Sequence, residues 1–203
     1  MEHMDRNELR KEKIKARDSL TAAERAEMSE RISRRILASE AYGRAETLLI
    51  YKGVRGEVRL DVLEAAAIAD GKRLAYPLCT GPGEMIALVP RDEGAWAKGA
   101  YGILEPVRER ALEITPQDID LVICPCTVFD AACGRMGMGA GYYDRYLPKC
   151  SRAVIAAAAF EVQKAEYVPM EPWDRAMGMV FTEMCVYGYE PEWDYRVTLR
   201  ADF

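Results

Sequence analysis

Histidine is almost absent from this chain of 203 residues: the single one is His3, next to the N-terminus. Catalytic triads with a Ser-His or Cys-His pair, and metal sites built from histidines, are therefore excluded as the basis of its chemistry. Whatever reaction the chain supports must use carboxylates, cations, tyrosines, backbone amides or a bound metal.

Long apolar runs are also missing, and none reaches the ~18–20 residues that a membrane-spanning helix needs. The first residues are charged and lack the apolar stretch of a signal peptide. We therefore expect a cytoplasmic protein with no membrane partner. The net charge of −5 argues against non-specific binding of nucleic acid, which requires a basic surface.

The cysteines show no regular spacing. In a chain of this size such spacing predicts reduced, mostly buried thiols rather than a disulfide framework. Cys124 and Cys126 form C-x-C, which is not the C-x₂-C of common zinc sites. The six cysteines are Cys79, Cys124, Cys126, Cys133, Cys150 and Cys185.

The pattern of apolar residues predicts one α/β domain over residues 1–203. Two helices are expected within residues 1–40, the first over 6–17 and washed by solvent. The second follows Thr21, which forms a capping box with Glu24. Strands and helices then alternate over residues 46–186, which predicts a mostly parallel sheet in a three-layer α/β/α sandwich. Expected strands cover 47–51, 74–78, 86–89, 121–124, 154–160 and 179–182, helices cover 60–70 and 142–147, and residues 187–203 form a tail.

The segment from Phe129 to Leu147 carries the densest chemical signal. It follows an expected buried strand and contains Gly134, Gly137, Gly139 and Gly141. Loops at the carboxyl ends of parallel strands are where α/β proteins bind ligands. Glycines let the backbone approach an anion, and the N–H groups of the loop and of the following helix would face it. Residues alone therefore predict a phosphate-binding loop, although a plain glycine-rich turn is the alternative.

This segment resembles the signature of the 5-formyltetrahydrofolate cyclo-ligase family, also called methenyltetrahydrofolate synthetases. The run Gly134-Arg135-Met136-Gly137-Met138-Gly139-x-Gly141-Tyr142-Tyr143-Asp144-Arg145 carries the likeness, and Phe129-Asp130 precedes it. Weaker elements follow in the family's order from about Arg6 to Glu183. They are Arg6-x-x-Leu9-Arg10, Tyr51 to Glu57, Tyr101 to Pro106, Gln163, Pro169 and Asp174. Departures include Trp173 where many members have histidine, Ala140 where Gly or Lys is frequent, and Gly53 where proline is common.

The resemblance implies a reaction in which ATP phosphorylates the formyl oxygen of 5-formyltetrahydrofolate. N10 then attacks, phosphate leaves, and the product is 5,10-methenyltetrahydrofolate. ATP and Mg²⁺ are the implied co-substrate and cofactor, a reduced folate is the small-molecule partner, and a monomer or weak homodimer is expected.

The resemblance also implies the site residues. Arg135, Asp144 and Glu57 would serve the reaction, with Glu57 in a positioning role, and Asp144 and Asp174 would hold the metal. The folate would contact Tyr51, Lys52, Glu57, Tyr101 and residues 138–142. ATP would contact Arg6, Asn7, Glu8, Leu9, Arg10, Arg135, Met136, Gly137, Met138, Gly139, Ala140, Gly141, Tyr142 and Tyr143.

Three alternatives stay open at this point. A sugar-phosphate isomerase or CoA transferase on a related sheet would also use an anion-binding loop, but would not need ATP. A catalytically silent or substrate-shifted paralogue would bind folate or nucleotide only. A nucleic-acid-binding module lacks support, because the chain shows no recognition motif and no basic stripe interleaved with aromatics.

Overall fold

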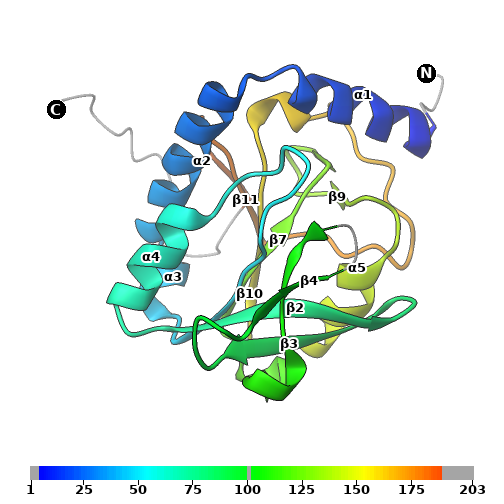
Figure 1. The fold of residues 1–203 in the computed structure, drawn as a ribbon. Coiled ribbons are helices and arrows are strands. Elements are labelled where there is room, and N and C mark those ends of the chain that lie inside the picture. Colours follow the sequence, from blue (N-terminus) through cyan, green and yellow to red (C-terminus); the bar gives the residue numbers. More distant parts are fainter. Residues whose placement is uncertain (1–4, 100–101, 189–203) are drawn as a thin grey trace, which may run out of the picture.

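The structure is a computed structural model that describes residues 5–99 and 102–188 (Figure 1). Within these residues no helix is both long and apolar enough to cross a bilayer. The helices are α1 (Arg6–Asp18), α2 (Ala22–Leu37), α3 (Glu40–Arg44), α4 (Asp61–Ala69) and α5 (Tyr142–Tyr146). Short 3₁₀ helices are η2 (Arg108–Arg110), η3 (Pro116–Asp118), η4 (Leu147–Lys149) and η5 (Glu161–Gln163).

Both helices expected before residue 40 are confirmed. Thr21 Oγ1 accepts a hydrogen bond from the Glu24 N–H (3.2 Å), and Glu24 Oε2 accepts one from the Thr21 N–H (2.7 Å). The capping box thus satisfies N–H groups that the first turn of α2 leaves without partners. Helix α3 was not expected, because five residues are too few to show a helical period.

Eight strands form the main sheet, in the order β12-β11-β10-β7-β1-β2-β3-β6. The five central strands, from β11 to β2, pair in parallel. The strands of this sheet are β1 (Thr47–Leu49), β2 (Arg73–Gly81), β3 (Glu84–Pro90), β6 (Ala111–Ile114), β7 (Leu121–Pro125), β10 (Val154–Ala158), β11 (Met179–Phe181) and β12 (Val186–Gly188). The predicted α/β class with a mostly parallel sheet is confirmed.

The edges of the sheet are antiparallel. β3 forms a hairpin with β2 through Gly81–Gly83, as expected, and β6 continues this edge. At the other edge β12 pairs with β11. Tyr187 and Gly188, which the sequence placed in the tail, therefore belong to the sheet; a three-residue strand is too short to show an alternating pattern.

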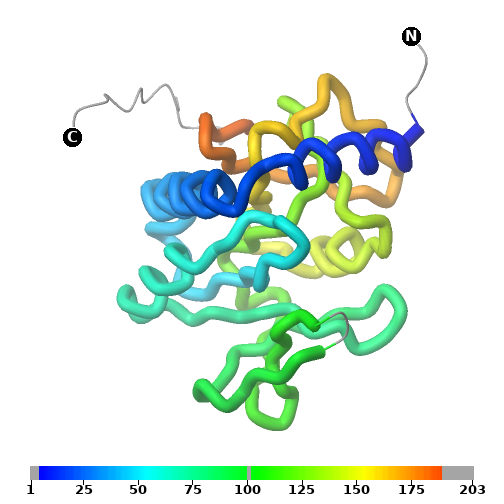
Figure 2. The backbone as a smooth tube through the Cα atoms, turned by 45° about the horizontal axis from the view of Figure 1, so that its top comes forward, coloured from blue at the N-terminus to red at the C-terminus, as the bar shows by residue number. Residues whose placement is uncertain are grey.

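Two small hairpins complete the fold. β4 (Trp96–Lys98) pairs with β5 (Leu104–Pro106), and β8 (Val128–Phe129) pairs with β9 (Arg135–Met136). The strands β4, β5 and β6, drawn in green in Figure 2, lie together at the β3 end of the sheet. The sequence showed neither hairpin, since strands of two or three residues carry no readable period.

The core lies on both faces of the sheet. One face packs against α2, α3 and α4 through residues such as Ile36, Tyr42 and Leu63. The other packs against α5 and η4 through residues such as Tyr146 and Leu147. Figure 1 shows these two sets of helices on opposite sides, which gives the three predicted layers.

Helix α1 crosses the carboxyl ends of the parallel strands, where it packs on η5 and β8. The sequence predicted a helix washed by solvent, and this is only partly right. Leu9 is buried with Val128, Met136 and Val168, and Arg17 is only 2% exposed. Burial of these two side chains fixes α1 over the edge of the sheet that carries the glycine-rich loop.

Candidate active site

The glycine-rich loop joins β9 to α5 at the carboxyl edge of the sheet. Gly139 and Gly141 have φ of 103° and 69°, a conformation that glycine adopts without steric cost. The loop is tied at both ends, since Arg10 Nε donates to the Gly137 carbonyl (3.0 Å) and Arg145 Nη1 donates to the Ala140 carbonyl (2.9 Å). It remains exposed from Met138 to Ala140.

The backbone N–H groups of residues 138–141 donate no hydrogen bond within the described part of the chain. Consecutive N–H groups of this kind, around left-handed glycines, form a concavity suited to an anion. The contribution expected from the following helix stays a prediction. α5 has only five residues, so its dipole is small compared with that of a longer helix.

Arg135 and Asp144 form an ion pair beside the loop. Arg135 Nη2 lies 2.9 Å from Asp144 Oδ1, and Arg135 is 2% exposed. Nη1 donates to the Pro125 carbonyl (3.2 Å), while Nε is buried without a partner. The ring of Tyr143 lies 5.9 Å from the guanidinium carbon. The pair places one cation and one carboxylate next to the loop.

A second ion pair joins Arg6 of α1 to Asp174. Arg6 Nη1 lies 2.6 Å from Asp174 Oδ2, which also accepts from the Glu171 N–H (2.8 Å). The next residue, Arg175, donates its N–H to Asp144 Oδ1 (3.2 Å). The fold thus brings together the two carboxylates predicted to hold a metal, although thirty residues separate them in the sequence.

The cations of α1 lie close to one another. Burial lowers the pKa of Arg10, and the charge of Arg6 lowers it further, although Asp174 acts in the opposite direction. Two guanidinium groups that repel each other next to unpartnered N–H groups favour an anion between them. Of the other predicted residues on α1, Asn7 accepts from Arg10 Nη1 (2.8 Å) and Glu8 is exposed.

Glu57 stands across the edge from the loop, on a turn after β1. Its Oε2 accepts from the Val54 N–H (3.0 Å), and burial raises the pKa of its carboxyl group. Tyr51 and Tyr143 have buried hydroxyl groups without partners. Burial, followed by charged neighbours that include Glu57, raises the pKa of both tyrosines well above its usual range. A buried carboxylate and two unpaired hydroxyls provide polar groups for a flat, mostly apolar ligand.

Some predicted contact residues have other partners. The Lys52 ammonium lies 2.5 Å from Glu64 Oε2 and about 5 Å from the ring centres of Tyr76 (5.2 Å) and Trp96 (5.0 Å). Leu9 and Met136 are core residues, so their side chains anchor α1 and β9 and do not face a ligand. Sequence spacing could not reveal these contacts. Tyr101 lies outside the described residues.

Asp130, which the resemblance singled out without a role, is a structural residue. Its carboxylate accepts from the N–H groups of Ala132 (3.0 Å), Gly134 (2.9 Å) and Val168 (2.8 Å). A Cβ at Gly134 would lie 3.0 Å from Asp130 Oδ2. Asp130 therefore holds the β8–β9 turn to the segment that leads to Asp174.

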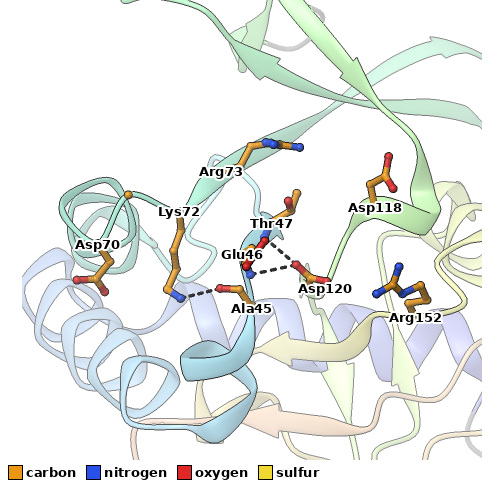
Figure 3. A pocket seen from close by; sticks show the side chains of 10 residues that line it. Ala45, Glu46, Thr47, Asp70, Lys72, Arg73, Asp118, Asp120 and Arg152 are labelled. Carbon is orange, nitrogen blue, oxygen red and sulfur yellow. Dashed lines mark hydrogen bonds between the residues drawn. The ribbon is translucent and has the colours of Figure 1, made fainter.

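A separate hollow of about 580 Å³ lies at the amino ends of the strands (Figure 3). Asp120 accepts there from the N–H groups of Glu46 (3.0 Å) and Thr47 (2.9 Å), and the Lys72 ammonium donates to the Ala45 carbonyl (2.6 Å). The charged side chains of Asp120 and Lys72 therefore form hydrogen bonds with neighbouring backbone groups. The hollow holds none of the predicted site residues.

The chain is similar to known proteins over most of its length. Residues 2–183 match the model of the 5-formyltetrahydrofolate cyclo-ligase family. The chain is 28% identical over 178 residues to a 5-formyltetrahydrofolate cyclo-ligase of Mus musculus (81% of this chain, 87% of the relative). It is 25% identical over 175 residues to that of Escherichia coli K12 (84% and 96%).

A solved structure extends the likeness to the whole fold. The NMR structure of Aquifex aeolicus 5,10-methenyltetrahydrofolate synthetase superimposes with a TM-score of 0.81 at 27% identity, covering 97% of this chain and 100% of that one. The predicted family is therefore confirmed. Since the family model spans nearly all the described residues, the chain belongs to the 5-formyltetrahydrofolate cyclo-ligase family.

Proposed function

We propose that the protein converts 5-formyltetrahydrofolate to 5,10-methenyltetrahydrofolate at the expense of ATP. The observation that carries the proposal is the loop of residues 137–141, whose N–H groups from Met138 to Gly141 are unpartnered and which lies beside two Arg–Asp pairs. The cytoplasmic location remains a prediction from composition.

The first step transfers the γ-phosphoryl group of ATP to the formyl oxygen, and ADP leaves. N10 then attacks the formyl carbon, the C–O bond to the phosphate breaks, and the N10 proton is released. Phosphoryl transfer depends on positioning and on neutralising charge more than on a strong base. The lack of a catalytic histidine is therefore compatible with this chemistry.

The loop and the arginines would hold the triphosphate. The N–H groups of residues 138–141 supply neutral donors, and Arg10 fixes the loop through the Gly137 carbonyl. Arg6 is 20% exposed, and Arg135 has a partner for only part of its guanidinium. On nucleotide binding, each arginine can direct donors to phosphate oxygens while its carboxylate partner remains close by.

Asp144 and Asp174 fit Mg²⁺ by the chemistry of their donors. Both are carboxylates, and within the described residues Asp144 Oδ2 and Asp174 Oδ1 accept no hydrogen bond. No group of three or more potential metal-binding side chains is assembled in the described part of the chain. Mg²⁺ usually takes one or two carboxylates together with phosphate oxygens, and when bound it would neutralise charge on the transferring group.

The folate would lie between the loop and the Glu57 turn. Tyr142 would supply aromatic surface, whereas Tyr51 is 5% exposed and would reach the folate through its hydroxyl group, which has no hydrogen-bond partner within the described residues. Glu57 would accept a hydrogen bond from the pterin or the N10 region, in a positioning role. We assign Lys52 an indirect part, because Glu64 holds its ammonium.

A silent paralogue that binds both ligands without turnover is the second candidate. Absorbance of the methenyl product distinguishes the two candidates. It is measured with 5-formyltetrahydrofolate and Mg²⁺ in the presence and absence of ATP. We expect an ATP-dependent rise that falls by about 10³-fold in Asp144→Asn, since phosphoryl transfer relies on its charge-neutralising groups.

Asp118→Asn is the matched control at the amino edge, where that carboxylate accepts only from Thr115 Oγ1 (2.6 Å). It should retain wild-type turnover. No rise with folded wild-type protein that still binds ATP and 5-formyltetrahydrofolate would establish the silent paralogue. Turnover without ATP would contradict both candidates.

A further inference from the structure

Arg17, in the last turn of α1, is buried without adequate partners. It is 2% exposed, and its Nε and Nη1 have no hydrogen-bond partner among the residues that the structure describes. Its nearest acid, Asp18, lies 3.7 Å away from Nε and is 57% exposed. A buried, incompletely paired guanidinium costs free energy of folding, which makes a purely stabilising role a poor explanation for it.

The contact that Arg17 does make is to a turn of the candidate site. Its Nη2 donates to the Arg55 carbonyl (2.7 Å). Arg55 and Gly56 have φ of 48° and 78°, and Glu57 closes the turn by donating its N–H to the Val54 carbonyl (2.9 Å). A left-handed conformation costs a non-glycine residue about 1–2 kcal/mol, so Arg55 needs such an external contact to stay in it.

The same turn packs on the end of α1. A Cβ at Gly56 would lie 3.4 Å from Asp18 Oδ1 and 3.7 Å from Arg17 Nε. The turn and the guanidinium are therefore close neighbours, and movement of one requires movement of the other.

The charge of Arg17 also acts on Glu57. Burial raises the pKa of Glu57, and the Val54 N–H, then Arg17 and then Arg55 oppose that rise. The other titratable groups facing Glu57 are the neutral Tyr51, Tyr143 and Cys126. Arg55 is exposed, so Arg17 is the cation near Glu57 that water screens least.

We propose that Arg17 is a positioning residue for Glu57: it fixes the turn of residues 54–57 through the Arg55 carbonyl and places a buried positive charge next to that turn. The expected effect on folate binding rests on the proposed function. The effect of Arg17 on the pKa of Glu57 does not rest on it and can be measured in ligand-free protein.

The sequence gives only a weak indication of this role. Arg17 lies eleven residues after Arg6 and seven after Arg10, so all three share one face of α1. The sequence predicted that this helix is washed by solvent, because only the tertiary structure shows which end of it is buried.

The first experiment is an NMR titration of the Glu57 carboxyl group in ligand-free protein. In Arg17→Met the pKa of Glu57 should rise, because an opposing positive charge is lost. Arg17→Lys keeps the charge and should shift the pKa less; it also serves if the Met variant does not fold. An unchanged pKa in folded Arg17→Met would overturn the proposal.

Arg35→Met is the matched control. Arg35 also donates to backbone carbonyls, those of Glu183 (3.2 Å) and Met184 (2.8 Å), and also has a buried Nε without a partner. It is not among the groups that influence Glu57. Its loss should lower stability without moving the pKa of Glu57; a shift as large as that of Arg17→Met would mean that any buried arginine has this effect.

The second experiment measures the dissociation constants of 5-formyltetrahydrofolate and of ATP. Arg17→Met should weaken folate binding about tenfold, the loss of roughly one charge-assisted hydrogen bond, while ATP binding changes less than twofold. A shifted pKa with unchanged folate affinity would overturn the positioning role. Wild-type protein that binds no folate would contradict the proposed function, and the titration would still decide the coupling.

Discussion

The two ends of the parallel strands both carry charged residues, but they use them differently. At the amino ends, Asp120 and Lys72 bond to nearby backbone groups around an open hollow. At the carboxyl ends, arginines and carboxylates pair with each other, and buried polar atoms of Arg17, Tyr51 and Tyr143 lack partners. The difference teaches that charged side chains at one end complete the hydrogen bonding of the backbone, whereas those at the other end pair with each other and leave polar atoms without partners.

The largest expected effect comes from Arg135. In Arg135→Met, turnover should fall by about 10³-fold, because an arginine that contacts a transferring phosphoryl group supplies an effect of this size. Steady-state measurement of the methenyl product at saturating ligand concentrations tests this. Turnover within threefold of wild type would mean that the guanidinium serves only to hold Asp144.

Asp120 should affect stability and not turnover. Asp120→Ala leaves the N–H groups of Glu46 and Thr47 without their acceptor, and we expect a loss of about 2 kcal/mol in the free energy of unfolding. Urea denaturation followed by circular dichroism measures this, with turnover of the folded variant as the control. A large loss of turnover would break the contrast between the two ends.

Glu57→Gln should weaken folate binding about tenfold and at the same time stabilise the protein above acidic pH. The folded protein binds the Glu57 proton more tightly than the unfolded chain, because burial raises its pKa from the ordinary 4.5. Wild type therefore loses stability as pH rises from that value through the raised one. The melting temperature of the variant minus that of wild type should grow over this window and then level off; a difference that is independent of pH would contradict the burial of a charge.

The smallest effect is expected at the rim of the hollow. Arg73 and Arg152 are exposed and line it, and in the described part of the chain neither side chain forms a hydrogen bond or ion pair. Arg73→Met and Arg152→Met should each change stability by less than about 0.5 kcal/mol and turnover by less than twofold. A larger change in turnover would show that the amino ends take part in function.

Local sequence patterns predicted much of the fold. The helices α1, α2 and α4 and the central parallel strands were predicted from periodicity and from the Thr21 capping box. Prediction failed for β6, β8, β9 and β12, because strands of two to four residues are defined by their partners and not by their own pattern. The same applies to Lys52, whose partner Glu64 could not be identified from spacing alone.

The sequence by itself determined the family signature, the glycines that permit left-handed backbone at Gly139 and Gly141, and the exclusion of histidine chemistry. These follow from residue identity and local geometry. Only the tertiary structure decided that Asp144 and Asp174 lie together, that Arg6 and Arg135 pair with them, and that Arg17 is buried beside the Glu57 turn. Such contacts join segments 9 to 168 residues apart, and their free energy depends on how helices and sheet pack, which no local pattern records.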